Sequence, residues 1–172
     1  MKTELQDNRS PDVQKLAELI KGIKIAMLTT VEQGGALRSR PMATQEVAID
    51  GDLWFFTQVD SPKADEVRRD AHVNVAFADP SAHRYVSVSG TAHVVRDAAK
   101  AKELWSPAYK LWFPKGLEDP SLALLRVVID QAEYWDAPSS AMVYLVGFLT
   151  SAVTGQRSQS PGSEHKKIVF NS

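Results

Sequence analysis

The sequence predicts a mainly β fold, a β-barrel built from antiparallel strands with small helices at its periphery. Six or seven short runs rich in branched and aromatic residues have strand character, and turn residues of the hairpin type join the early ones. Short helical segments interrupt these runs, a pattern typical of barrels with peripheral helices. At 172 residues the chain suits one domain. We expect a single domain over 1–172, with its core at about 10–140, a C-terminal helix over 139–154 and a mobile tail over 155–172.

The first half of the chain should hold an amphipathic helix followed by two hairpins. Ser10 and Pro11 are a typical helix cap and first residue. Two adjacent glycines, Gly34 and Gly35, favour a hairpin turn because they accept positive φ. Pro41 has no amide hydrogen to donate, so its strand should lie at a sheet edge or bulge there. The expected elements are a helix over 11–20, strands over 23–31, 37–49 and 53–57, and a helix over 62–69.

The second half should continue the sheet and add short helices. Gly90, inside a long alternating run, indicates a bulge or kink. Asp97 is a natural N-cap for the helix that follows. Lys167 to Phe170 could dock on the rest of the fold even though the tail before them is rich in Ser, Gly and Gln. The expected elements are strands over 73–78, 84–95, 122–129 and 131–135, a helix over 97–104, and a short helix and loop over 105–114.

Charge and composition exclude several classes of partner. Lys and Arg number 20 against 21 Asp and Glu, and no basic run exists, which argues against nucleic acid and anionic membranes. The apolar run over 141–153 is short of the roughly 20 residues that cross a bilayer. The chain has no cysteine, which fits a reducing compartment, and its first residues lack the apolar core of a signal peptide. We therefore expect a cytoplasmic protein with no nucleic acid and no membrane as partner.

One stretch gathers the groups that an anion requires. Arg38 and Arg40 stand two apart on an expected strand, so their side chains share a face. Ser61 and Lys63 lie at the junction between an expected strand and an expected helix, and a helix N-terminus favours an anion. These groups could converge on one phosphate. The neighbouring pair Asp65 and Glu66 is interpreted as ordinary solvated helix charge.

Other chemistry is poorly supported by the sequence. The four histidines are scattered, and no two have metal-ligand spacing on one element. Neither a glycine-rich phosphate loop nor a nucleophile elbow occurs. An organic cofactor would supply the missing reactivity.

The order of several short motifs resembles a known family. They are R-P-M (40–42), L-W-F-F-T (53–57), S-P-K (61–63), V-S-V-S-G (86–90), W-S-P (105–107), W-F-P-K-G-L-E-D-P (112–120) and Y-W-D-A-P (134–138). Each is weak alone, but together they resemble the pyridoxamine 5′-phosphate oxidase-like superfamily of FMN-binding split barrels, and within it the general stress protein 26 group. The likeness covers roughly residues 10–140.

This resemblance implies a six-stranded antiparallel split barrel and a homodimer with FMN at the subunit interface. Arg40 matches the arginine of the first FMN motif, and Ser61 and Lys63 match the element that holds the phosphate. Trp135 matches a tryptophan that reaches the cofactor from the other subunit. The full set of expected cofactor-binding residues is Arg38, Arg40, Pro41, Met42, Ala43, Gln45, Phe56, Thr57, Ser61, Lys63, Tyr85 and Trp135. The other tryptophans, Trp54, Trp105 and Trp112, are expected in core or dimer contacts.

The sequence departs from the true oxidases where these hold their substrate. Gln45 stands at a lysine position, the region 97–113 has no arginine, and no Arg-x-His follows Trp135. Leaving a substrate phosphate without donors would be costly, so little or no pyridoxine-phosphate oxidase activity is expected.

Two functions remain open, with a third less favoured. One is an FMN-dependent oxidoreductase that acts on an unidentified small molecule, with NAD(P)H as a possible donor. The other is a stress protein that binds FMN to sequester or sense it without turnover. A different cofactor, haem or the deazaflavin F420, is the third; haem would need His72 or His83 as its axial ligand.

Overall fold

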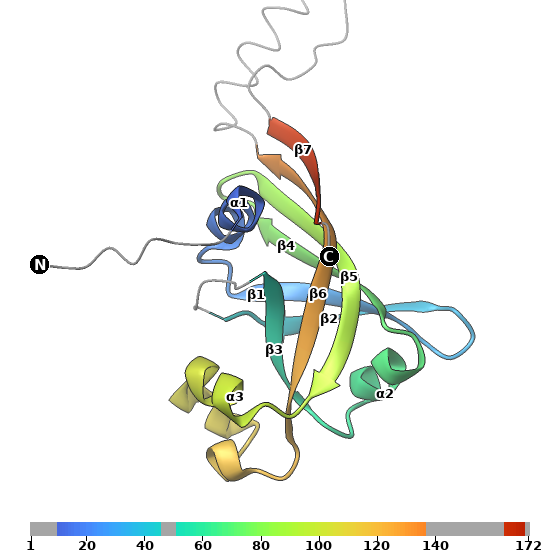
Figure 1. Cartoon of the computed structure of the whole chain (residues 1–172), viewed down its shortest axis with the longest axis vertical. Coiled ribbons are helices and arrows are strands. Elements are labelled where there is room, and N and C mark those ends of the chain that lie inside the picture. Colours follow the sequence, from blue (N-terminus) through green and yellow to red (C-terminus); the bar gives the residue numbers. More distant parts are fainter. Residues whose placement is uncertain (1–9, 46–50, 137–163, 171–172) are drawn as a thin grey trace, which may run out of the picture.

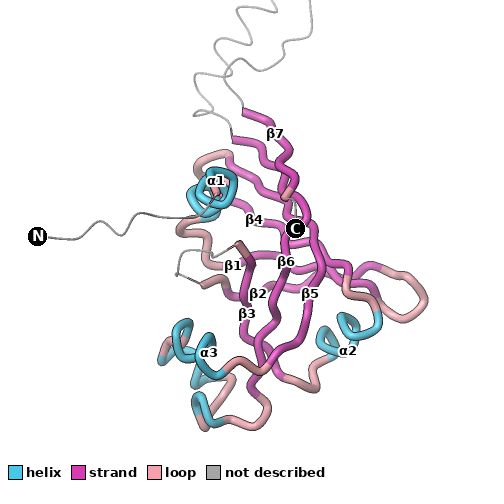
Figure 2. Tube along the Cα trace, viewed as in Figure 1, coloured by secondary structure: helices cyan, strands magenta, loops and turns pink. Residues whose placement is uncertain are grey.

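The computed structural model describes residues 10–45, 51–136 and 164–170. Within these ranges the chain forms one antiparallel sheet of seven strands, with helices outside it (Figures 1 and 2). The helices are α1 (Pro11–Ile20), α2 (Pro62–Arg69), α3 (Ala98–Leu104) and the 3₁₀ turns η1 (Pro107–Leu111) and η2 (Gly116–Glu118). The strands are β1 (Ile25–Val31), β2 (Leu37–Ala43), β3 (Asp52–Gln58), β4 (His72–Asp79), β5 (Arg84–Val95), β6 (Leu122–Asp136) and β7 (Glu164–Val169). The expected mainly β fold is confirmed.

The strand order makes this sheet an open, split barrel. Neighbours follow the path β2-β1-β4-β5-β6-β3, and all of the pairs are antiparallel. The end strands β2 and β3 approach each other, but no ladder joins them in the part of the chain that the structure describes. Strand β6 is long enough to serve two partners on one side, β3 along its first half and β7 along its second.

Strand β7 corrects the expected number of six strands. The sequence predicts a mobile tail over 155–172 from which 167–170 could dock, and the docking is confirmed over a longer stretch, since residues 164–169 pair with residues 131–136 of β6. Ile168 is buried, and the Phe170 amide donates to the Asp130 carbonyl at 2.8 Å. Only the segment before β7 has the small polar composition that indicated a tail. The helix expected over 139–154 lies outside the described residues.

Gly90 lies at a register shift between β5 and β6, as its place in the sequence indicated. The pairing moves from Ser89↔Gln131 to Gly90↔Ile129 and leaves Asp130 as the extra residue of a bulge. A Cβ on Gly90 would lie 2.0 Å from the Val128 carbonyl oxygen, so only glycine fits here. The two runs expected over 122–129 and 131–135 therefore form one strand.

Strand β2 is an edge strand, as Pro41 predicted. Among the strands of the described ranges it pairs with β1 alone, with Pro41 opposite Met27. The strand ends at Ala43 rather than 49, and residues 46–50 lie outside the described ranges. An edge strand keeps one side open, and this side positions the site described below.

The core lies inside the barrel, where alternate residues of the strands meet α1 and α2. Its fully buried side chains include Leu28, Phe55, Val88 and Tyr134. Helix α1 begins at its predicted cap, where the Val13 amide donates to the Ser10 hydroxyl. None of the helices in the described ranges is long and apolar enough to span a bilayer.

Candidate functional site

A hollow of about 230 Å³ lies between the edge strand β2, the strand β3, and the segments that follow β3 and α3. One wall comes from β2, one from the aromatic residues around η1, and the polar end from the junction of β3 with α2. Its lining residues are Pro41, Met42, Ala43, Phe56, Thr57, Gln58, Lys63, Tyr109, Trp112 and Phe113. Six of the twelve residues expected at a cofactor site therefore meet in one hollow.

The polar end forms because β3 turns directly into α2. Ser61 occupies the N-cap position and Pro62 the first position of α2, which spans the predicted range 62–69. The Ser61 hydroxyl makes no bond to a helix amide; it donates to the Gln58 carbonyl at 2.8 Å and lies 3.1 Å from the Thr57 hydroxyl. The strand-to-helix turn thus brings Thr57, Ser61 and Lys63 together, with Thr57 and Lys63 lining the hollow.

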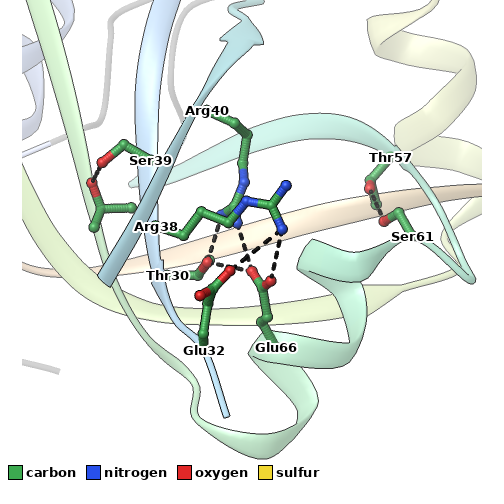
Figure 3. Close-up of polar contacts among 9 residues, drawn as sticks. Thr30, Glu32, Arg38, Ser39, Arg40, Thr57, Ser61 and Glu66 are labelled. Atoms are coloured by element: carbon green, nitrogen blue, oxygen red, sulfur yellow. Dashed lines mark hydrogen bonds and ion pairs between the residues drawn. The ribbon is translucent and has the colours of Figure 1, made fainter. Parts of the chain in front are cut away.

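The two arginines are held by glutamates beside this end (Figure 3). Arg40 donates through Nη2 to Glu66 Oε2 at 2.6 Å and through Nη1 to the Thr30 hydroxyl at 2.5 Å. Arg38 is more exposed, and its Nη1 lies 3.4 Å from Glu32 Oε1 and 3.7 Å from Glu66 Oε1. Neither arginine is among the lining residues. Both guanidinium groups therefore lie on carboxylates outside the lining of the hollow, and their expected convergence on one phosphate stays a prediction.

Glu66 is not the solvated charge that the sequence indicated. Only 4% of this residue is exposed, and its Oε2 accepts from both Arg40 and the Thr30 hydroxyl, the latter at 2.6 Å. Helix α2 buries Ala64, Glu66 and Val67 against the sheet, and the carboxylate lies among donors rather than water. A buried carboxylate with charge-assisted partners is stable in the ionised form.

The charges of this cluster shift two pKa values. Burial alone would raise the pKa of Glu66, but the Thr30 hydrogen bond and the Arg40 guanidinium outweigh it, so the pKa of Glu66 lies below its ordinary value. Burial lowers the pKa of Lys63, and the Arg40 charge lowers it further while Glu66 partly offsets both. Lys63 is thus a partly desolvated ammonium that would gain from an anionic partner.

The opposite wall of the hollow is aromatic. The Phe56 ring centroid lies 4.4 Å from that of Tyr109 and 5.7 Å from that of Trp105. Trp112 lines the hollow and is 54% exposed, so it is not a core residue of the single chain. A flat apolar ring could lie against such a wall.

Gln45 lies beside this wall, and its side chain contacts Tyr109 of η1. The Tyr109 hydroxyl donates to Gln45 Oε1 at 3.1 Å. Gln45 Nε2 is buried and has no hydrogen-bond partner among the described residues. A buried amide nitrogen without an acceptor is costly, and a carbonyl or ring nitrogen of a bound molecule would satisfy it.

Tyr85 and Trp135 are not brought to the hollow within one chain. They lie opposite each other on β5 and β6, with 43% and 41% of their surfaces exposed. Trp135 stacks on His165 of β7, with ring centroids 5.0 Å apart. The two histidines considered as haem ligands, His72 and His83, do not line the hollow either.

Sequence reasoning missed the aromatic wall and the buried carboxylate. The residues that the structure adds to the site are Thr30, Gln58, Glu66, Tyr109, Trp112 and Phe113. A signal for Glu66 existed, since it follows Lys63 by three positions and so shares its side of the helix. The aromatic wall had no comparable signal, because nothing in the sequence shows that the segment after α3 folds over β3.

Comparison with known proteins establishes the family. Residues 11–159 match the family model described as "Pyridoxamine 5′-phosphate oxidase like", and the chain belongs to this family. The matched range contains all of the residues that the sequence placed at the cofactor site.

Similar proteins include stress proteins and flavin binders. Protein bli-3 of Neurospora crassa is 29% identical over 154 residues, which are 84% of this chain and 74% of that protein. The general stress FMN/FAD binding protein of Xanthomonas citri is 32% identical, with a TM-score of 0.63 over 76% of this chain and 93% of its own. A protein assigned as general stress protein 26 from Jannaschia sp. CCS1 is 21% identical and shares the fold, with a TM-score of 0.71 over 94% and 100% of the two chains.

Proposed function

We propose that this protein binds FMN in the hollow beside β2 and acts as a flavin-dependent oxidoreductase on a small molecule. The observation that carries the proposal is the hollow itself, which joins a desolvated ammonium and a hydroxyl at one end to an aromatic wall at the other. FMN has the matching polarity, with a phosphate dianion at one end and a flat ring system at the other.

The polar end supports a phosphate for reasons of charge. Lys63 is the cation that lines the hollow, and Thr57 adds a hydroxyl to the same lining. Binding a dianion would relieve the desolvation of Lys63, because an opposite charge favours the protonated form. A lysine near a phosphate is a common arrangement in nucleotide sites.

The remaining lining fits the ring of a flavin. Pro41, Met42 and Ala43 offer edge-strand backbone and apolar side chains, and Trp112 offers an exposed aromatic face. Gln45, beside the lining, has an amide nitrogen with no partner among the described residues, and this nitrogen would donate to a ring carbonyl or nitrogen. When bound, the flavin would supply the hydride chemistry, and the protein would supply binding and orientation.

A second copy of the chain would complete the site. Ile25, Met27, Tyr85 and Trp135 expose large apolar side chains on the outer face of the sheet. Such a row is typical of a surface that another protein covers. In a homodimer, the partner's Tyr85 and Trp135 could reach the flavin that one chain holds in its hollow, as the family resemblance implies. This proposal places the enzyme in the cytoplasm, in keeping with its lack of cysteine.

The aromatic wall also bears on the substrate. The hollow is lined by Tyr109, Trp112 and Phe113, which carry no positive charge. The family resemblance implies that the oxidases hold their substrate phosphate from the corresponding segment. Because this lining offers no cation to a substrate phosphate, we expect a substrate without a phosphate group. We also expect little or no oxidation of pyridoxine 5′-phosphate.

Three measurements on the purified protein test the proposal. An FMN titration followed by absorption should give saturable flavin bands, and light scattering should give the mass of a dimer. Trp135→Ala should weaken FMN binding several-fold, whereas Trp54→Ala, on β3 and away from the hollow lining, should not. No flavin binding under any condition would refute the proposal, and a monomer that binds FMN with full affinity would refute the shared site.

Turnover separates the enzyme from a storage or sensing protein. The FMN-loaded protein should be reduced by NADH or NADPH and reoxidised by a small electron acceptor over repeated cycles. Tight FMN binding with no reduction by either nucleotide would favour sequestration or sensing instead. That alternative has one supporting observation, since the lining residues include no carboxylate or histidine that could act as a general acid or base.

A further inference from the structure

Glu66 is a buried carboxylate to which the proposed FMN site gives no role. It lies on α2, three residues after Lys63, and it faces two strands rather than solvent. The charged groups that surround it are Arg38 and Arg40 from β2 and Lys63 from its own helix. Thr30 from β1 adds the hydroxyl.

The contacts of Glu66 fix one side chain above all, that of Arg40. Oε2 of Glu66 accepts from Arg40 Nη2 at 2.6 Å, and the Thr30 hydroxyl bridges the two by accepting from Arg40 Nη1 and donating to the same Oε2. Arg40 is thus held at two nitrogens by groups from two other elements. An arginine presents five N–H donors, so donors remain for a further partner.

The position of Arg40 relates it to the hollow. The three residues that follow it on β2 line the hollow, and its charge acts on the lining ammonium of Lys63. A phosphate bound at Lys63 would therefore lie within the influence of a second cation whose place is already set. Fixing a long side chain before binding removes an entropy cost that binding would otherwise bear.

We propose that Glu66 is a positioning residue, which holds Arg40 beside Lys63 so that the flavin phosphate meets both cations. The inference rests on the proposed FMN site. It differs from a simple counter-charge role, in which Glu66 would only offset the buried guanidinium. In that case removal of the carboxylate would strengthen phosphate binding rather than weaken it.

The test measures selectivity for the phosphate, given by the ratio of the dissociation constants for riboflavin and FMN. Riboflavin lacks the phosphate but shares the ring. General damage to the hollow therefore weakens the binding of both ligands, and its effect cancels in the ratio. Glu66→Ala should lower the ratio about tenfold, which is the effect of about one hydrogen bond to a charged group. Glu66→Gln should keep the ratio at or above the wild-type value, because its amide oxygen can occupy the place of Oε2.

Two further variants make the test decisive. Asp65→Ala removes a carboxylate from the same helix, where it pairs with Arg68 at 2.9 Å on the surface, and should leave the ratio unchanged. Thr30→Val removes the hydroxyl that bridges Arg40 and Glu66 but leaves their ion pair, so it should lower the ratio by about threefold, less than the loss of the carboxylate. If Glu66→Ala does not fold, the ratio measured for Thr30→Val tests the positioning role in its place.

The outcomes separate this inference from the proposed function. A wild-type protein that binds riboflavin and FMN equally would refute the phosphate site itself. If the wild-type protein prefers FMN and Glu66→Ala keeps or raises the ratio, only the positioning role is refuted. Where Glu66→Ala cannot be measured, an unchanged ratio in Thr30→Val refutes that role in the same way.

Discussion

Replacing Lys63 with methionine tests the polar end of the hollow directly. Methionine keeps most of the length and the apolar stem of lysine while removing the ammonium. Because burial and Arg40 both lower the pKa of Lys63, its charge is poorly compensated in the free protein. An anion that binds there gains more than it would at a fully solvated lysine.

The magnitude follows from the kind of interaction that the substitution removes. A hydrogen bond to a charged group contributes about 1.5–3 kcal/mol. Since each 1.4 kcal/mol is about a factor of ten, Lys63→Met should raise the FMN dissociation constant about 10- to 100-fold. Riboflavin has no phosphate, so its dissociation constant should change less than about twofold.

The assay is a titration of the apoprotein with each flavin, followed by quenching of flavin fluorescence. Lys102→Met, on the exposed side of α3, is the matched control, because it removes the same charge away from the hollow. It should leave both constants unchanged. Equal losses of affinity for riboflavin and FMN in Lys63→Met would show that Lys63 shapes the hollow without binding phosphate, and no loss for either would refute the site.

Three other predictions come from separate parts of the structure. First, the ratio of riboflavin to FMN dissociation constants should fall as pH rises through the pKa of Lys63. The fall should begin at a pH below the ordinary lysine pKa of 10.5, because the pKa of Lys63 is lowered in the folded protein. The ratio for Lys63→Met should be flat over the same range. Second, Gly90→Ala should lower the free energy of unfolding in urea by about 3 kcal/mol or more, since its Cβ would lie 2.0 Å from a backbone oxygen. The control Ser89→Ala should lower it by about 1 kcal/mol or less. A stable Gly90→Ala would show that the bulge can relax. Third, Trp112→Ala should raise the dissociation constants of riboflavin and FMN alike, about three- to tenfold, because the flavin ring would no longer pack on an indole. The control Leu111→Ala, at a residue 79% exposed and outside the hollow lining, should change neither constant. An effect confined to FMN would contradict packing on the ring.

Much of the local structure was readable because it depends on near neighbours. Ser10 and Asp97 cap the helices that follow them, since a cap needs only a side-chain oxygen three residues before an amide. Pro41 marks an edge strand because a missing donor is a property of the residue itself. The same holds for Gly90, whose backbone approaches β6 too closely for any side chain.

The errors arose where distant segments meet. Glu66 has the pattern of a surface charge on a short helix, and only the packing of α2 against β1 and β2 shows that it is enclosed by arginines. Strand β7 follows a segment with the composition of a tail, and its six residues are too short a strand signal until β6 offers an edge, although the sequence indicated that 167–170 could dock. Trp112, expected in core or dimer contacts, lies on the open side of the hollow within one chain, which excludes the core contact and leaves the dimer contact as a prediction.

Short motifs and local patterns were enough to predict the family and the mainly β architecture, and to nominate residues for a phosphate and ring site. Those features depend on short motifs, caps and turns, whose energies are local. The sharing of the cations depends instead on the tertiary fold. Arg40 pairs with Glu66 and Lys63 lines the hollow because α2 docks with its carboxylate toward the sheet, and a choice among buried charges depends on long-range packing that no short motif contains.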